Sequence, residues 1–255
     1  MRCDILGSKV NVIKTDEALN NIEDLLNRQS SSYICFSNVH TIVTGRQNLK
    51  FRDITNNASI VFPDGMPLVW LCKFNGYCDL EKCSGPDLME KIFEVSEKKG
   101  YTHYLYGSTQ ETLRLLYNNL KCKYKTLKIV GMFSPPFRPL TEEEDKMLLD
   151  SINKLDPDFI WVGLGAPKQE IWMMEHVNKI KSSVLIGVGA AFNFHSGLVK
   201  RAPLWMQNIG LEWLYRLMQE PRRLWKRYLI TNALFIYYIL SDLLLNKFKN
   251  PKENT

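Results

Sequence analysis

The sequence has few of the features that mark a secreted, metal-dependent or disulfide-stapled protein. Its six cysteines form no C-x-x-C pair, and neither they nor the four histidines have the spacing of zinc ligands. The first residues lack the apolar run of about 7–15 residues that a secretory signal requires. We therefore predict reduced, mostly buried thiols, no required metal, no cofactor and a cytosolic location.

The excess positive charge is confined to the C-terminal part of the chain. The 255 residues include 33 Lys and Arg and 27 Asp and Glu, a formal net charge of +6. Residues 200–255 contain ten bases and four acids, so the first 199 residues carry no net charge. The same segment holds three of the six tryptophans. This pattern predicts a surface for an anionic partner and leaves membrane, nucleic acid and phosphorylated substrate open.

Short apolar runs alternate with amphipathic segments through most of the chain. Thr141 and Glu144 form a capping-box pattern that opens a helix ending near Leu155, and Pro86 and Gly100 mark the two ends of another helix. We predict an α/β fold, a Rossmann-like, mostly parallel sheet flanked by helices. The apolar runs predict strands at residues 10–13, 33–36, 59–62, 103–106, 127–130, 159–162 and 184–188.

After Gly197 the pattern becomes helical. We predict one helix at residues 203–219, a break at Glu220-Pro221 and a second helix at 222–245. Polar residues interrupt its apolar part, which is shorter than the about 20 apolar residues of a membrane span. This favours a helix in the membrane interface over one that packs on the core or on another subunit. We predict a catalytic α/β domain at 1–197 and a helical membrane-associating segment at 198–255.

Residues that follow the strands are the first candidates for ligand contacts, because open parallel sheets bind ligands beyond the carboxyl ends of their strands. Asp64 lies in a Pro-Asp-Gly turn, where it is either a turn residue or a carboxylate held in the crevice. Glycine loops follow three other strands, and their amides favour a phosphate. We predict contacts to a phosphate-bearing ligand, such as a nucleotide, from Asn38, His40, Thr41, Gly107, Ser108, Gly131, Gly165, Gln169 and Asn193.

Two familiar motifs are incomplete or misplaced. Asp156-Pro157-Asp158 has the D-x-D form of a cation site, but it precedes its strand and so lies at the opposite edge of the sheet. Lys168 stands where a G-x-G-x-x-G motif needs its third glycine. This disfavours the alternative function, a nicotinamide-dependent oxidoreductase of Rossmann type. The apolar residues near the C-terminus favour a membrane over nucleic acid as the partner of the basic segment.

The sequence resembles the WecG/TagA/CpsF glycosyltransferases of bacterial cell-surface polymer and teichoic acid synthesis. The most specific matches are residues 167–170, Pro-Lys-Gln-Glu, and 210–216, Gly-Leu-Glu-Trp-Leu-Tyr-Arg. Further matches include 38–40, 62–65, 84–88, 201–203 and 220–223, and together the matching segments span about residues 5–230.

The resemblance implies an inverting transfer of a sugar from a UDP-sugar to a sugar on a polyprenyl diphosphate, usually undecaprenyl-diphosphate N-acetylglucosamine. Such an enzyme is peripheral on the inner face of the bacterial membrane, and a homo-oligomer is compatible with the sequence. The donor sugar and the polymer stay open.

The resemblance also implies roles for single residues. It makes Asp64 the general base and places Asn38 and Gln169 in the substrate pocket. The C-terminal segment brings three arginines over the diphosphate, and Lys226 and Arg227 are left for lipid headgroups. Asn193 departs from the family, in which we expect an aspartate near the nucleoside. The arginines that match are Arg216, Arg222 and Arg223.

Overall fold

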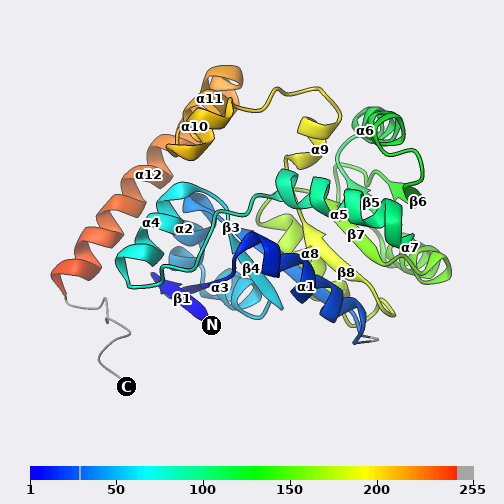
Figure 1. Ribbon diagram of the computed structural model, residues 1–255, viewed down its shortest axis with the longest axis horizontal. Coiled ribbons are helices and arrows are strands. Elements are labelled where there is room, and N and C mark those ends of the chain that lie inside the picture. The colour runs from blue at the N-terminus through cyan, green and yellow to red at the C-terminus, as the bar shows by residue number, and fades with distance from the viewer. Residues whose placement is uncertain (29, 246–255) are drawn as a thin grey trace. The chain divides into compact units, whose positions relative to one another are not determined.

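The computed structural model describes residues 1–28 and 30–245 (Figure 1). Its strands are β1 (Arg2–Ile5), β2 (Ser8–Asn11), β3 (Ser32–Ser37), β4 (Ile60–Pro63), β5 (Thr102–Gly107), β6 (Lys128–Phe133), β7 (Phe159–Gly163) and β8 (Val184–Gly187). Its helices are α1 (Thr15–Leu26), α2 (Val39–Gln47), α3 (Leu49–Asn56), α4 (Met66–Phe74), α5 (Gly85–Lys99), α6 (Gln110–Lys123), α7 (Glu142–Leu155), α8 (Lys168–His176), α9 (Ala191–His195), α10 (Leu204–Asn208), α11 (Glu212–Gln219) and α12 (Pro221–Leu244).

The main sheet confirms the predicted α/β fold. Its six strands have the order β4-β3-β8-β7-β5-β6, and the registers from β3 through β8, β7 and β5 to β6 are parallel. Two parallel strands cannot be joined by a tight hairpin, so the chain must cross over between them, and here helices form these crossovers. Strands β3, β4 and β8 are buried along their whole length, as expected for strands covered on both faces.

The hairpin of β1 and β2 was only half predicted. These strands pair antiparallel around Leu6 and Gly7, which both have positive φ. In β1, only Cys3 and Ile5 are buried, and Asp4 between them is exposed. Two apolar residues alternating with polar ones are too short a pattern to separate a strand from a loop.

The chain divides into two compact units, each described here by itself. Unit 1 comprises residues 1–15, 36–84 and the segment from 201 on, and unit 2 comprises 16–35 and 85–200. The C-terminal helices therefore belong to the same unit as α2, α3 and α4. Of the predicted segment 198–255, residues 246–255 lie outside the described residues. The predicted functional division after Gly197 stays a prediction.

In unit 1, α12 packs along α2 through one face. Leu224, Phe235 and Ile239 are buried on this face. Near its end, Asp242 lies 3.3 Å from the guanidinium of Arg46, whose cation also lies over the ring of Tyr238. The opposite face of α12 exposes large apolar side chains. One face of α12 thus packs on the body, as the second alternative expects, and its place in a membrane interface stays a prediction.

The prediction of a single helix at residues 203–219 was wrong. Helix α10 ends at Asn208, and α11 begins only at Glu212. Gly210 between them has a φ of +74°, and a Cβ there would lie 3.1 Å from the ring of Trp70. A side chain at this position would be strained and crowded, so the glycine divides the helix.

Unit 2 confirms the predicted helix ends. Thr141 caps α7 and forms the capping box with Glu144, and α5 ends at Lys99 before Gly100, which has a φ of +76°. His103, Phe159 and Trp161 stack along neighbouring strands in the core. Among the residues that the structure describes, no helix is long and apolar enough to cross a membrane.

Candidate active site

Asp64 follows the last residue of β4, as the sequence predicts. Its backbone N–H donates to the carbonyl of Ser37, the last residue of β3, at 2.7 Å. The next residue, Gly65, has a φ of +119° and turns the chain into α4. The turn therefore holds the half-buried Asp64 carboxyl at the carboxyl end of its strand.

Charged side chains from three segments of unit 1 surround this carboxyl. Glu212, at the start of α11, lies 3.5 Å from the ammonium of Lys82 and 3.6 Å from Nε of Arg201. Arg201 also donates to the hydroxyl of Ser84 at 3.0 Å. Arg216 of α11 acts on Asp64 electrostatically. The sequence assigned no role to Lys82, Arg201 or Glu212, because their proximity to Asp64 depends on the tertiary fold.

Burial raises the pKa of Asp64 to about 6. This value already includes a smaller rise due to the negative charge of Glu212 and the opposing effect of the cations Lys82, Arg216 and Arg201. A carboxyl with this pKa is ionised at neutral pH and still holds a proton better than an ordinary aspartate. These are the properties of a general base that works near neutrality.

Glu212 tests this account of the site. We expect Glu212→Gln to remove a like charge beside Asp64, lower its pKa and shift the acid limb of the kcat/KM profile to lower pH. The measurement is the pH dependence of kcat/KM, with Glu175→Gln on the surface of unit 2 as a matched control. An unchanged acid limb in active Glu212→Gln protein would contradict the assignment of the limb to Asp64.

Three predicted residues lie at the N-terminus of α2. The side-chain oxygen of Asn38 accepts from the backbone of Thr41 at 3.2 Å, and the Thr41 hydroxyl accepts from the Asn38 backbone at 2.7 Å. This capping box uses the amide oxygen of Asn38 and the hydroxyl of Thr41. Burial and the nearby Arg227 guanidinium lower the pKa of His40 to about 4, so its ring is neutral at pH 7.

The basic residues of the C-terminal helices fall into two groups. Arg216 lies among the charges around Asp64, and Arg227 is half-buried near His40. Arg222 and Arg223 are exposed in the first turn of α12, where Arg223 pairs with Glu220 at 2.6 Å. Of the three arginines predicted for the diphosphate, Arg216 thus acts electrostatically on Asp64, whereas Arg222 and Arg223 are exposed at the start of α12.

In unit 2, three glycine loops share one edge of the sheet, as predicted. The parallel registers place Gly107 opposite Gly163, and Val162 opposite Gly187. A Cβ on Gly107 would lie 2.7 Å from the backbone of Gly163, so only glycine permits this approach. Backbone amides are left accessible at such a strand edge, where a phosphate can bind them.

The loop after β5 has an unusual backbone. Gly107 and Ser108 both have positive φ, of +118° and +59°. The Ser108 carbonyl accepts from the hydroxyl of Ser134 at 2.7 Å, and Thr109 then caps α6. Strained residues followed by a helix N-terminus are common where proteins bind phosphate.

Gln169 braces the loop after β7. Its side-chain oxygen accepts from the N–H of Gly165 at 3.1 Å, and its nitrogen donates to the carbonyl of Gly187 at 3.0 Å and to Glu170 at 2.9 Å. The side chain is buried. These contacts are internal to the protein, and the substrate contact of Gln169 stays a prediction.

Gly131 and Asn193 complete the predicted set. Strand β6 extends to Phe133, so Gly131 lies inside the strand rather than after it. A Cβ there would lie 2.5 Å from the Tyr104 ring, and packing explains this glycine. The prediction that this strand ends at residue 130 was wrong. Gly131 resembles the start of a loop, but β6 continues through it to Phe133. Asn193 is half-buried in the short helix α9.

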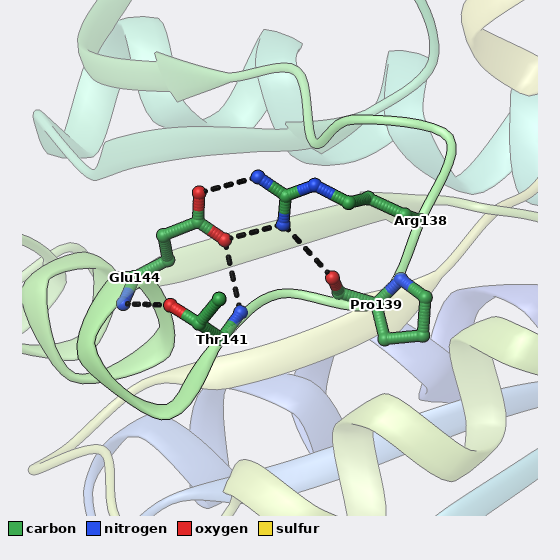
Figure 2. A network of polar contacts seen from close by, with 4 residues as sticks. All are labelled: Arg138, Pro139, Thr141 and Glu144. Carbon is green, nitrogen blue, oxygen red and sulfur yellow. Dashed lines mark hydrogen bonds and ion pairs between the residues drawn. The ribbon is translucent and has the colours of Figure 1, made fainter.

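The hydrogen-bonded loop after β6 presents an aromatic ring that the sequence did not single out. Arg138 binds both carboxylate oxygens of Glu144, at 2.6 and 2.7 Å, and Glu144 accepts from the N–H of Thr141 at 2.9 Å (Figure 2). The adjoining Phe137 is fully exposed. An exposed apolar ring on a fixed loop is a candidate stacking surface.

The D-x-D motif is used in the fold as predicted. Asp156 ends α7 in a left-handed conformation, and Asp158 accepts from the backbone and hydroxyl of Thr102 at 2.7 and 2.8 Å. Within residues 1–28 and 30–245, no three His, Cys, Asp or Glu side chains gather as a metal site.

A parallel α/β sheet with glycine loops and a carboxylate set among cations is typical of enzymes that transfer a group between phosphate-bearing substrates. A model described as the Glycosyl transferase WecG/TagA/CpsF family matches residues 3–249, and the chain belongs to this family of glycosyltransferases. The resemblance in the motifs is thereby confirmed, and membership favours the transferase over the oxidoreductase alternative.

Three curated relatives have the same name, N-acetylglucosaminyldiphosphoundecaprenol N-acetyl-beta-D-mannosaminyltransferase. The protein of Bacillus subtilis (strain 168) is 30% identical over 177 residues, 69% of this chain and 67% of the relative. That of Bacillus spizizenii is 26% identical over 204 residues, 80% and 77% of the two chains. That of Staphylococcus aureus (strain MW2) is 25% identical over 240 residues, 93% and 92% of the two chains.

Proposed function

We propose that this protein transfers a sugar, of the N-acetylmannosamine type or a hexose, from a UDP-sugar to N-acetylglucosamine linked to undecaprenyl diphosphate, with inversion at the anomeric carbon. The observation that carries the proposal is Asp64, a carboxylate with a pKa near 6 set among Lys82, Arg201 and Arg216. The names of the relatives support the acceptor and the N-acetylmannosamine type of sugar.

Unit 1 supplies the proton transfer in this proposal. The Asp64 carboxylate takes the proton of the acceptor hydroxyl while the oxygen bonds to the anomeric carbon of the donor. The bond from that carbon to the UDP oxygen breaks on the opposite side, and its electron pair goes to the diphosphate. One displacement inverts the anomeric centre. Arg216 stabilises the developing charge through bidentate hydrogen bonds, and the Asn38 amide nitrogen can donate to a sugar because its oxygen caps α2.

Unit 2 holds the nucleotide in this proposal. The amides after β5 and the N-terminus of α6 bind the diphosphate, and Phe137 stacks on the base. Asn193 can hydrogen-bond the ribose or the base, although it lacks the charge of the aspartate that we expect in the family.

Phe137 makes the nucleotide part testable. We expect Phe137→Ala to weaken UDP binding by about 5–160-fold, because stacking on an aromatic side chain contributes about 1–3 kcal/mol per base. Titration calorimetry with UDP measures this, and Met147→Ala, another exposed apolar residue of unit 2, serves as the control. Equal UDP affinity in the two variants would contradict the stacking role.

The transfer itself is tested with a panel of UDP-sugars and a short-chain prenyl-diphosphate N-acetylglucosamine acceptor. The proposal expects a disaccharide product whose mass identifies the donor and whose linkage shows inversion. Binding titrations of the protein with NAD and with UDP distinguish the transferase from the oxidoreductase alternative, since only a transferase of this kind needs the uridine nucleotide.

We further propose that the protein is peripheral on the inner face of the membrane. Its exposed α12 face combines basic and apolar side chains, which suits an anionic bilayer. Salt-sensitive binding to duplex DNA as strong as that to anionic vesicles would favour nucleic acid instead.

A further inference from the structure

An exposed apolar patch lies on unit 1 outside α12. Helix α4 buries Leu68 and Cys72 on its inner face, while Trp70 is 50% and Phe74 is 72% exposed on its outer face. The ring of Trp70 reaches Gly210, next to the exposed Ile209. The patch therefore joins α4 to the segment between α10 and α11.

Helix α10 continues this patch. Its inner side buries Met206 and Gln207, while Leu204 is 74% and Trp205 is 61% exposed. We call the set of Trp70, Phe74, Leu204, Trp205 and Ile209 the α4–α10 patch. Two tryptophans and a phenylalanine on one small surface, all exposed at half or more, exceed the scattered apolar residues of an ordinary surface.

The charges of these helices indicate what covers the patch. Helices α4 and α10 contain no acid, and Lys73 is exposed between Trp70 and Phe74. In α12 the sole acid, Asp242, is buried against Arg46. Their exposed faces thus offer apolar, aromatic and basic groups.

That combination matches the boundary of a bilayer. Aromatic rings prefer the level of the lipid headgroups, and Lys73 suits an anionic phosphate. A protein partner of opposite charge would meet the same basic groups, but the large unpaired aromatic surface and the apolar face of α12 favour a lipid surface.

We propose that the α4–α10 patch inserts into the headgroup region of an anionic membrane, so that the body of the protein as well as its C-terminal helix contacts lipid. This inference rests on the membrane association proposed above and adds α4 to it. The sequence analysis placed the whole membrane role in the C-terminal segment.

The test compares wild-type protein, Trp70→Ser/Phe74→Ser and Phe74→Ser by flotation with vesicles of phosphatidylcholine containing one third phosphatidylglycerol. We expect the double variant to partition about tenfold more weakly and the single variant about threefold more weakly, because each ring removes apolar contact with lipid. The double variant also loses the contact of Trp70 with Gly210, which could impair its folding. Phe74→Ser keeps Trp70, so it tests the patch without that loss. Leu49→Ser and Met147→Ser, at exposed apolar positions away from the patch, serve as controls.

Transfer to the short-chain acceptor separates this inference from the proposed function. Weaker vesicle binding with unchanged short-chain transfer supports the patch. Unchanged vesicle binding in both variants overturns the inference. If the variants also sediment as a smaller species than the wild-type protein, a second copy of the chain covers the patch. Loss of short-chain transfer in the wild-type protein would instead count against the proposed function.

Discussion

Asp64→Asn should lower kcat by about 10²–10⁴-fold, the usual contribution of a positioned general base. The amide keeps the shape of the side chain and cannot accept the proton of the attacking hydroxyl. In the wild-type protein, kcat/KM should rise with pH through about 6 as Asp64 loses its proton. The measurement is kcat for transfer to the short-chain acceptor and kcat/KM across pH 5–8.

The same substitution has an opposite effect on folding. Because the pKa of Asp64 is raised in the folded protein, its ionisation opposes folding above its ordinary pKa, and the full cost is present above pH 6. Asp64→Asn should therefore stabilise the protein at pH 7.5, by up to about 3 kcal/mol, and have little effect below pH 4. Thermal unfolding at the two pH values measures this difference.

The control for Asp64 is the exposed Asp150 of α7, whose change to Asn should alter neither rate nor stability. Near-normal turnover of Asp64→Asn would remove Asp64 from the proton transfer. A lower melting temperature of Asp64→Asn than of the wild-type protein at pH 7.5 would show that the fold stabilises the ionised carboxylate. That result would contradict the raised pKa of Asp64.

Arg216→Ala should lower kcat by about 10²–10³-fold, the effect of losing one preorganised group that stabilises charge in the transition state. Arg216→Lys should recover little of this loss, since an ammonium keeps the charge and lacks the two-pronged geometry that binds phosphate oxygens. Steady-state kinetics with saturating acceptor, varying the UDP-sugar, separates the effect on kcat from that on KM.

Arg222→Ala and Arg223→Ala provide the comparison within the same C-terminal helices. Both arginines are exposed at the start of α12, so we expect much smaller losses of kcat than for Arg216→Ala. Comparable losses for all three would restore the prediction that the three arginines act together on the diphosphate. Arg114→Ala, on the exposed face of α6, controls for loss of a positive charge.

The sequence predicted the sheet and the position of Asp64 because both depend on local patterns. Buried parallel strands are continuously apolar, and a Pro-Asp-Gly turn ends one of them. Prediction from the sequence was wrong where one local pattern is compatible with two structures. Gly131 resembled the start of a loop and lies inside β6, and Gly210 was included in a helix that it divides.

The neighbours of Asp64 could not be predicted by spacing. Lys82 and Glu212 are 130 residues apart and meet because the chain returns to unit 1 after residue 200. The role of Gln169 was open for a related reason. Its sequence motif marks the residue, while the contacts that occupy both ends of its amide depend on Gly165 and Gly187 being brought together by the sheet.

The ion pair between Arg46 and Asp242 has a consequence for the acceptor. It fixes the far end of α12 to the last turn of α2, and the first turn of α2 begins at Asn38. The nine residues of α2 span about 13 Å, a length that a helix holds without bending. Arg227 of α12 also lies near His40 in the first turn of α2, so the two helices run side by side. If α12 rests on the bilayer, α2 therefore lies along it, and Asn38 stands one layer of helix above the lipid that anchors the acceptor.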